Sequence, residues 1–187
     1  MTQRLFVAIE IGDVGKRALG RIQSRLRRLL PSVRWVKPDT VHLTLRFIGD
    51  TDESRVGDAA DALARAAAGC APFDFTLRGV GAFPDARRPR VLWIGVEEPG
   101  GSLAALADRL NARLSAAGFP PEERPFSPHI TIGRIRDRAG GDCVSALSPL
   151  HDEPAARARA SEACLFRSAL TPAGPIHTVL CRVPFNG

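Results

Sequence analysis

Two segments of this chain repeat one alternating pattern of polar and apolar residues. The first reads HLTLRF over residues 42–47, and the second reads HITIGR over residues 129–134. Successive side chains of a β-strand point to opposite faces, so each segment predicts a strand with histidine and threonine on one face and aliphatic residues on the other. The two histidines stand 87 positions apart in a chain of 187 residues. This spacing predicts an internal duplication, with one such strand in each half.

The rest of the chain alternates between strand-like and helix-like patterns. Further strands are predicted at residues 4–9, around Trp35, and at 73–80, 91–96, 163–170 and 176–183. Helices are predicted at about 13–30, 52–68 and 102–117, with a weak one at 142–148, and a turn is predicted at 49–50. The short connections indicate an α+β fold built on antiparallel sheets. With 44% hydrophobic and 25% charged residues the composition is that of an ordinary folded protein, and the length fits a single domain over residues 1–187.

Paired imidazoles and hydroxyls suit the chemistry of a phosphodiester. If the polar faces of the two strands meet across a groove, they present His42, Thr44, His129 and Thr131 to one site. Imidazole has an ordinary pKa of about 6.5, so near neutrality one histidine can accept a proton from the nucleophile while the other donates one to the leaving oxygen. The threonine hydroxyls can donate hydrogen bonds to the non-bridging oxygens, and Arg134 can add a charge-assisted pair.

A metal centre is the main chemical alternative for two histidines. Neither run has a carboxylate at metal-ligand spacing, and a metal-bound imidazole could not also donate a proton. The four cysteines, Cys70, Cys143, Cys164 and Cys181, contain no CxxC pair that would indicate zinc or a redox centre. The sequence therefore predicts acid–base catalysis without a metal or another cofactor, and cysteines that are reduced and partly buried.

The chain is basic, which favours an anionic partner. Its formal net charge is +6 and its isoelectric point is near 10.1. One helix pattern carries a stripe of arginines, Arg17, Arg21, Arg25 and Arg28. This stripe is more typical of a solvated helix face than of a nucleic-acid-binding surface. Acidic residues interrupt the apolar run near the N-terminus too early for a signal peptide, and no apolar stretch reaches membrane-spanning length. We therefore expect a monomeric cytoplasmic protein without a membrane partner.

The two histidine runs also carry a family resemblance. HLTL and HITI match the His-x-Thr-x signature of the two-histidine phosphoesterases, and the chain resembles the bacterial and archaeal RNA 2′,3′-cyclic phosphodiesterases, the 2′-5′ RNA ligase family. The resemblance covers most of the chain, because it also includes RLFVAIE, HLTLRFIGD, GAFP, RPRVLWIGV, RPFSPHITIGR and LFRSALTPAGPIHTVL in the family's order.

This resemblance implies a bilobal, duplicated fold with two antiparallel sheets around a central groove and helices on the outer faces. It also implies that a terminal 2′,3′-cyclic phosphate, on RNA or a nucleotide, is hydrolysed to a 2′-phosphomonoester without a metal, and that 2′-5′ ligation is a side reaction. The family's motif positions correspond to His42 and His129 for catalysis, to Thr44, Thr131 and Arg134 for phosphate binding, and to Phe83 for stacking on a base. We take His42 as the acid and His129 as the base, although the near-symmetry of the motifs permits the reverse.

Several other residues have structural as well as functional interpretations. His177 lies in a strand pattern where relatives commonly carry tyrosine, which puts a substrate contact there in doubt and favours a structural role. His151 is expected in a solvated loop, and Trp35 and Trp93 near the core. Phe83, in a predicted loop over residues 81–90, could equally fill an apolar gap. The alternative function is a noncatalytic nucleotide- or RNA-binding protein that uses the same groove; the matched proton donor and acceptor argue against it.

Overall fold

The computed structural model describes residues 1–135, 142–171 and 174–187. Nine strands occur in this part of the chain: β1 (Thr2–Glu10), β2 (Arg34–Trp35), β3 (His42–Asp52), β4 (Phe73–Phe83), β5 (Val91–Glu97), β6 (His129–Arg134), β7 (Pro154–Ala160), β8 (Glu162–Thr171) and β9 (Gly174–Pro184). The α-helices are α1 (Gly12–Arg27), α2 (Val56–Ala67), α3 (Ser102–Ala116) and α4 (Cys143–Leu147), with short 3-10 helices at Pro38–Thr40, Glu53–Arg55 and Ser148–Leu150.

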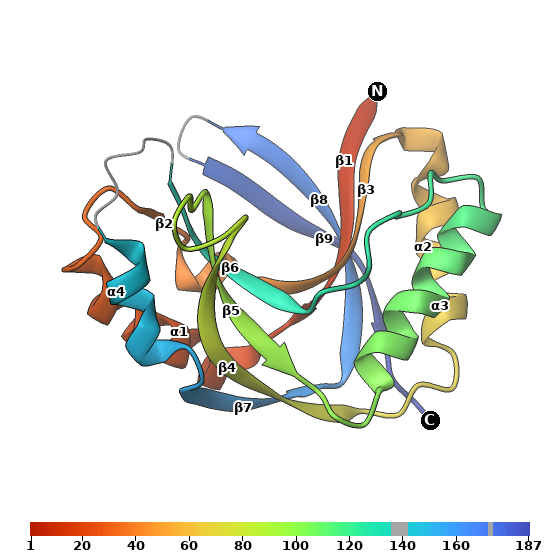
Figure 1. Ribbon diagram of the computed structural model, residues 1–187. Coiled ribbons are helices and arrows are strands. Elements are labelled where there is room, and N and C mark those ends of the chain that lie inside the picture. The colour runs from red at the N-terminus through yellow and green to blue at the C-terminus, as the bar shows by residue number, and fades with distance from the viewer. Residues whose placement is uncertain (136–141, 172–173) are drawn as a thin grey trace.

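The strands form two antiparallel sheets that share strands between the two halves of the chain (Figure 1). One sheet has the order β3-β1-β8-β9 and the other has the order β2-β6-β5-β4-β7. Strands β3 and β1 from the first half therefore join β8 and β9 from the second, while β6 and β5 join β4 from the first half. Each histidine run lies next to the first long strand of its own half, which confirms the predicted duplicated α+β fold.

The helices lie on two outer sides of the molecule (Figure 1). Helices α2 and α3 pack against each other; α2 also contacts β8 and β9, and α3 contacts β3. Helix α1 packs against β7 at the other side. This arrangement matches the prediction of helices outside two sheets. No helix in the described ranges is long and apolar enough to cross a membrane.

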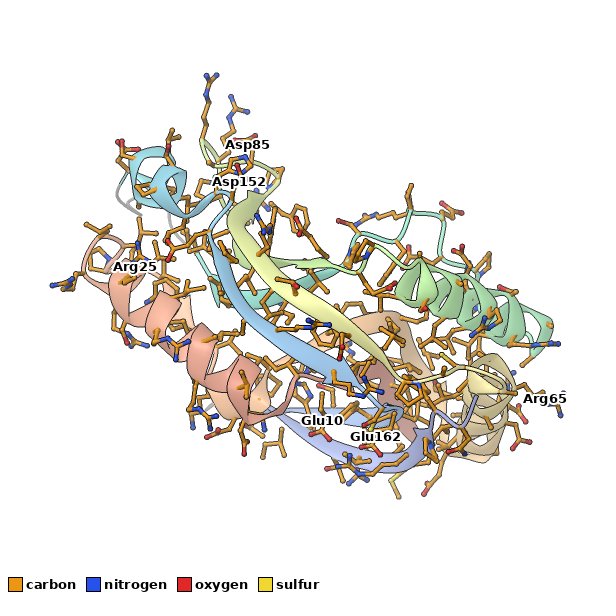
Figure 2. The ribbon with its side chains drawn as sticks, turned by 90° about the horizontal axis from the view of Figure 1, so that it is seen from below. Glu10, Arg25, Arg65, Asp85, Asp152 and Glu162 are labelled. Carbon is orange, nitrogen blue, oxygen red and sulfur yellow. The ribbon has the colours of Figure 1, made fainter. Side chains whose placement is uncertain are left out.

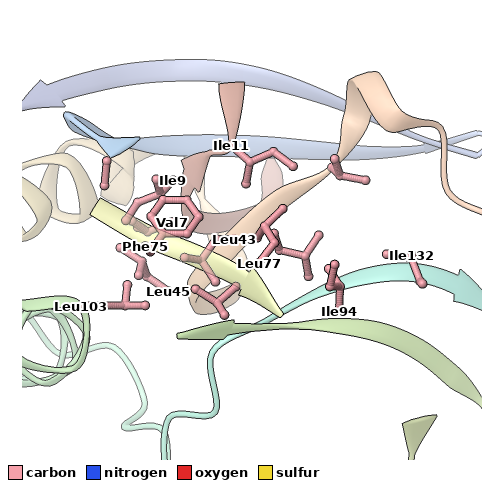
Figure 3. Packing of buried hydrophobic residues seen from close by; sticks show 14 of the residues in the cluster. Val7, Ile9, Ile11, Leu43, Leu45, Phe75, Leu77, Ile94, Leu103 and Ile132 are labelled. Carbon is pink, nitrogen blue, oxygen red and sulfur yellow. The ribbon is translucent and has the colours of Figure 1, made fainter. Parts of the chain in front are cut away.

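One hydrophobic core lies against both histidine strands. Leu43 and Leu45 of β3 and Ile130 and Ile132 of β6 are all buried in the same apolar cluster. Figure 3 shows Leu43, Leu45 and Ile132 among the buried side chains of the neighbouring strands. The alternation predicted from the sequence is therefore confirmed: the aliphatic residues face the core, and the histidines and threonines on the opposite faces are only partly buried.

Two predictions about the strands were wrong. The turn expected at residues 49–50 is absent, because β3 continues through it to Asp52 with a shift of pairing register opposite Leu5 and Phe6. Gly49 has φ +90°, a left-handed conformation that favours glycine, so it allows an irregularity within the strand and not a reversal. Strand β7 was not predicted at all, yet it pairs with β4 along its length.

Helix α1 is shorter than predicted, because it ends at Arg27 and not near residue 30. Ala18, Ile22 and Leu26 lie on its buried face. This face also includes Gln23, whose Nε2 donates hydrogen bonds to the carbonyl oxygens of Val36 at 2.7 Å and Ile132 at 2.9 Å. Gln23 thus ties the helix to the histidine-bearing strand β6.

Candidate active site

The two histidines occupy equivalent places at the starts of their strands. His42 Nδ1 lies 3.2 Å from the carbonyl oxygen of Thr40, and His129 Nδ1 lies 2.7 Å from that of Ser127. A carbonyl oxygen only accepts hydrogen bonds, so each Nδ1 is the donor. In the neutral form this leaves each Nε2 free to accept a proton, and in the protonated form free to donate one. Both imidazoles are therefore held with the same nitrogen available for chemistry.

A bulge in β6 brings Arg134 to the face that carries His129 and Thr131. Thr131 pairs with Trp93 and Gly133 pairs with Leu92, so Ile132 is an extra residue in the ladder. Strict alternation would put a residue five positions after His129 on the opposite face. Because the bulge shifts the pattern by one residue, Arg134 returns to the face of β6 that carries His129 and Thr131, where its side chain is exposed. We call this face of the sheet the histidine face.

Strand β3 carries the equivalent bulge. Thr44 pairs with Ala8 and Arg46 pairs with Val7, which makes Leu45 the extra residue. Phe47 thus returns to the face of His42, at the position that Arg134 occupies in the second half, and its side chain is 62% exposed. The two halves of the chain therefore share the bulge as well as the histidine strand. At the equivalent position after the bulge, however, the first half has Phe47 and the second half has Arg134.

Phe83 lies beside the second histidine. It pairs with Val91, which in turn pairs with Arg134, so Phe83 and Arg134 share one row across the sheet. The Phe83 ring approaches His129 edge-on, with 4.9 Å between centroids, and lies 5.4 Å from Trp93. Phe83 ends strand β4, which corrects the expectation that residues 81–90 are all loop. The half-buried ring is in a position either to contact a base or to support His129.

The first histidine lies in an aromatic cluster. His42 stacks on Phe6 at 4.6 Å between centroids and lies 5.8 Å from Phe166. His177 of β9 meets His42 edge-on at 5.2 Å. Burial, followed by the charge of His177, lowers the pKa of His42 to about 4, and burial also lowers the pKa of His177. His42 is therefore neutral over the physiological range.

Sequence reasoning missed the proximity of His177 to His42. Its alternating strand pattern indicated only that it occupies one face of a strand. The pairing of β9 with β8, and of β8 with β1, puts it on the face of His42, a long-range arrangement with no local signal. His151, in contrast, is exposed as predicted, next to Asp152.

A group of potential metal ligands lies next to this face but is occupied by an arginine. Ligand atoms of Glu10, Glu162 and Cys164 come within 4.8 Å of one another, the one such group of three in the described ranges. Figure 2 shows Glu10 and Glu162 close together. Arg182 Nη1 donates a hydrogen bond to Glu10 at 2.6 Å and another to Glu162, and these bonds raise the pKa of Arg182. The cluster is thus an ion-pair network in which one guanidinium bridges two carboxylates.

The four cysteines are free thiols: Cys70, Cys143 and Cys164 are buried and Cys181 is partly so, as predicted. A cavity of about 260 Å³ lies between α1 and β7, away from the histidines. Its lining includes Arg21, Arg25 and Glu153, and the last two form an ion pair. None of the predicted site residues borders it.

The arrangement presents two imidazoles, two hydroxyls and a guanidinium on the faces of two strands in contact. Strands β3 and β6 lie against each other where the two sheets meet. Thr44 and Thr131, two residues beyond the histidines, stay half-exposed on the same faces. Such a set can bind a phosphate, accept one proton and donate another.

A duplicated α+β fold with one His-x-Thr strand in each repeat defines the class of this protein. The family model of LigT like Phosphoesterase matches the chain twice, over residues 9–93 and 94–177, so that each match contains one histidine run. The chain belongs to this family, and the predicted resemblance is confirmed.

Relatives cover nearly the whole chain. An RNA 2′,3′-cyclic phosphodiesterase of Methanothermobacter thermautotrophicus is 35% identical over 179 residues, which cover 95% of this chain and 96% of the relative. The crystal structure of a Thermus thermophilus protein matches with a TM-score of 0.82 and 31% identity over 98% of both chains. Escherichia coli LigT complexed with 3′-AMP matches with a TM-score of 0.78 and 26% identity over 100% of both chains.

Proposed function

We propose that this protein is an enzyme that hydrolyses the terminal 2′,3′-cyclic phosphate of RNA to a 2′-phosphomonoester, without a metal. The observation that carries the proposal is the matched pair of histidines, each held through Nδ1 by a backbone carbonyl so that Nε2 stays available. The name of the Methanothermobacter relative and the 3′-AMP bound to Escherichia coli LigT support the same class of substrate.

The different surroundings of the two histidines support a division of roles. Burial keeps His42 neutral and therefore in the form that can accept a proton, so we assign it as the base and His129 as the acid. This reverses the assignment favoured from the sequence, where the near-symmetry of the motifs left both open. His42 removes a proton from water, the water oxygen bonds to phosphorus, the bond from phosphorus to O3′ breaks, and His129 protonates O3′. The phosphate stays on O2′, and both histidines return to their starting forms by exchange with solvent.

The remaining site residues bind the substrate in this proposal. Thr44 and Thr131 donate hydrogen bonds to the non-bridging oxygens, and Arg134 pairs with the same charge. Phe83 stacks on the terminal base, from its place beside His129. If a 5′-hydroxyl replaces water as the nucleophile, the same proton transfers join two RNA ends through a 2′-5′ bond, so ligation is a side activity of this site.

A noncatalytic RNA- or nucleotide-binding protein remains the second candidate. The formal net charge of +6 and the exposed guanidinium at Arg134 favour such a role equally well. Binding alone, however, does not need two imidazoles with the same free nitrogen. A single 187-residue domain, a monomeric state and a cytoplasmic location belong to both proposals as predictions.

Incubation with adenosine 2′,3′-cyclic phosphate separates the candidates. The enzyme proposal predicts adenosine 2′-phosphate, and a loss of turnover of about 10² to 10⁴-fold in His42→Ala and in His129→Ala, because each removes a proton-transfer group. His151→Ala, at an exposed imidazole away from the site, is the matched control and should retain full turnover. Binding of the nucleotide without any product would favour the noncatalytic candidate.

A further inference from the structure

Arg34, which has no role in the proposed reaction, lies next to Arg134. Arg34 forms half of the two-residue strand β2 and pairs directly with Arg134 on β6. Residues that pair across antiparallel strands share a face, so the exposed Arg34 lies on the histidine face. A Cβ placed on Gly174 would lie 3.8 Å from Arg34 Nη2, so this guanidinium reaches the start of β9 in the other sheet.

The loop between β4 and β5 adds three more arginines close to this position. The backbone N–H of Arg90 donates to the carbonyl of Phe83 at 2.8 Å, and the carbonyl of Arg90 accepts from Ile135, directly after β6, at 2.9 Å. Asp85 Oδ1 accepts from the backbone N–H groups of Arg87 at 2.7 Å and Arg88 at 2.9 Å. The loop is thus anchored at its base to β4 and to the residue after β6, and Asp85, labelled in Figure 2, closes a turn within it.

We call Arg34, Arg87, Arg88 and Arg90 the arginine rim. All four side chains are exposed. Among the described residues, no ion pair involves any member of the rim. The single acid of the loop, Asp85, is already engaged with backbone N–H groups. The rim therefore concentrates positive charge at the Arg134 end of the histidine face.

The geometry points to a binding surface for single-stranded RNA: we propose that the arginine rim holds the backbone phosphates on the 5′ side of the terminal nucleotide. The inference rests on the proposed function. One cyclic phosphate can engage Arg134, so Arg34 in the same row and the three arginines of the neighbouring loop are left for further phosphates. Those phosphates exist in an RNA strand and are absent from a nucleoside 2′,3′-cyclic phosphate.

The chain contains its own control for charge. Arg17, Arg21 and Arg28 are exposed on α1 or directly after it, and the buried face of this helix packs toward the core. They too take part in no ion pair among the described residues. Replacing three of these arginines removes the same net charge as replacing three of the rim, but from a helix on the outer side of the molecule. A general electrostatic attraction would respond equally to both changes.

The test compares kcat/KM for adenosine 2′,3′-cyclic phosphate with kcat/KM for an adenosine dinucleotide and an octanucleotide that end in the same group. Arg34→Gln should lower the ratio of dinucleotide to mononucleotide activity about tenfold, which corresponds to one charge-assisted contact. The triple variant R87Q/R88Q/R90Q should lower the ratio of kcat/KM for the octanucleotide to kcat/KM for the mononucleotide. The control variant R17Q/R21Q/R28Q should leave both this ratio and the dinucleotide ratio unchanged. Each lost contact should also reduce the slope of log affinity against log salt by about 0.7.

Binding of an octanucleotide with a 2′-phosphate end, measured by fluorescence anisotropy, gives a readout that does not depend on turnover. Weaker binding in the rim variants, with the α1 variants unaffected, would support the rim even if the wild-type protein hydrolysed nothing. The proposal would be overturned if the rim variants lost kcat/KM equally for the mononucleotide and the oligonucleotides, or if neither the ratios nor the binding changed. Equal effects of the rim and α1 variants would also overturn it.

Discussion

At the scale of single residues, the two histidines are alike in their backbone contacts and different in their surroundings. Both donate from Nδ1 to the carbonyl two positions earlier. His42, however, is stacked on Phe6 and faces His177, whereas His129 has the edge of Phe83 beside it. A buried imidazole holds a proton less readily than a solvated one. Duplication therefore supplied two equivalent groups, and burial lowers the pKa of the His42 imidazole.

Replacing His177 should shift the pH dependence of catalysis. The charge of His177 lowers the pKa of His42, whereas Glu10 and the Thr40 carbonyl raise it, with burial as the largest influence. In His177→Phe the positive charge is lost and an aromatic ring is kept, so the pKa of His42 should rise. The base must be deprotonated to act, so the acidic limb of the kcat/KM profile should move to higher pH.

NMR titration of the His42 imidazole in the same variant measures this shift directly. His151→Phe, at an exposed position, is the control and should leave the profile in place. An acidic limb that does not move in His177→Phe, or that moves to lower pH, would show that His177 only packs against His42.

The residues of the site could be found from the sequence more easily than their relations in space. Alternation was enough to put His42 with Thr44 and His129 with Thr131 on common faces. The same alternation would have excluded Arg134 from that face, and only the bulge at Ile132 brings it back. A bulge is an interruption of hydrogen-bond pairing between two strands, so one strand's own sequence does not reveal it.

At the scale of elements, the unpredicted strand β7 shows how weak a local signal can be. Its sequence, PAARARA, alternates alanine with arginine, and neither residue favours a strand. The strand forms because it pairs with β4, where Arg157 and Arg159 both contact Asp74. The helices and the long apolar strands, in contrast, carry their own periodicity and were predicted within a few residues.

Gln23 offers a test of the link between α1 and the histidine strand. Gln23→Leu keeps much of the side-chain volume but leaves the carbonyl groups of Val36 and Ile132 without that donor. We expect the free energy of unfolding to fall by about 1–3 kcal/mol, as measured by urea denaturation. Gln3→Leu, at a half-buried position near the start of β1, is a control for the chemical change.

The same experiment tests whether the chain unfolds as one domain. Trp35 and Trp93 both lie in the five-stranded sheet, so fluorescence follows that sheet, whereas far-UV circular dichroism follows all elements. The two signals should give one midpoint in the wild type and in Gln23→Leu. Two separate transitions, or an unchanged stability in the variant, would contradict this account of the link.

At the scale of the whole molecule, the two halves of the chain are exchanged between the sheets. Each sheet is completed by strands from the other repeat, and α1 follows β1 in sequence but packs against β7 of the other sheet. The duplication could be predicted from two short runs, but this exchange could not, because it depends on pairings between distant segments. The exchange explains how two strands 87 positions apart come to lie against each other.

In the proposed mechanism, two histidines hydrolyse a cyclic phosphate by acid–base catalysis. Such a pair is active when the base is neutral and the acid is protonated, so kcat/KM should follow a bell-shaped curve against pH. Because the pKa of His42 is lowered to about 4, the acidic limb should lie well below 6.5, the ordinary value for histidine.

The most direct measurement is the rate of hydrolysis of adenosine 2′,3′-cyclic phosphate across pH, with and without an excess of chelator. The account predicts the same bell-shaped curve in both series, with adenosine 2′-phosphate as the product. Loss of activity in chelator, restored by one divalent ion, would contradict it, because a metal-bound hydroxide would then be the nucleophile.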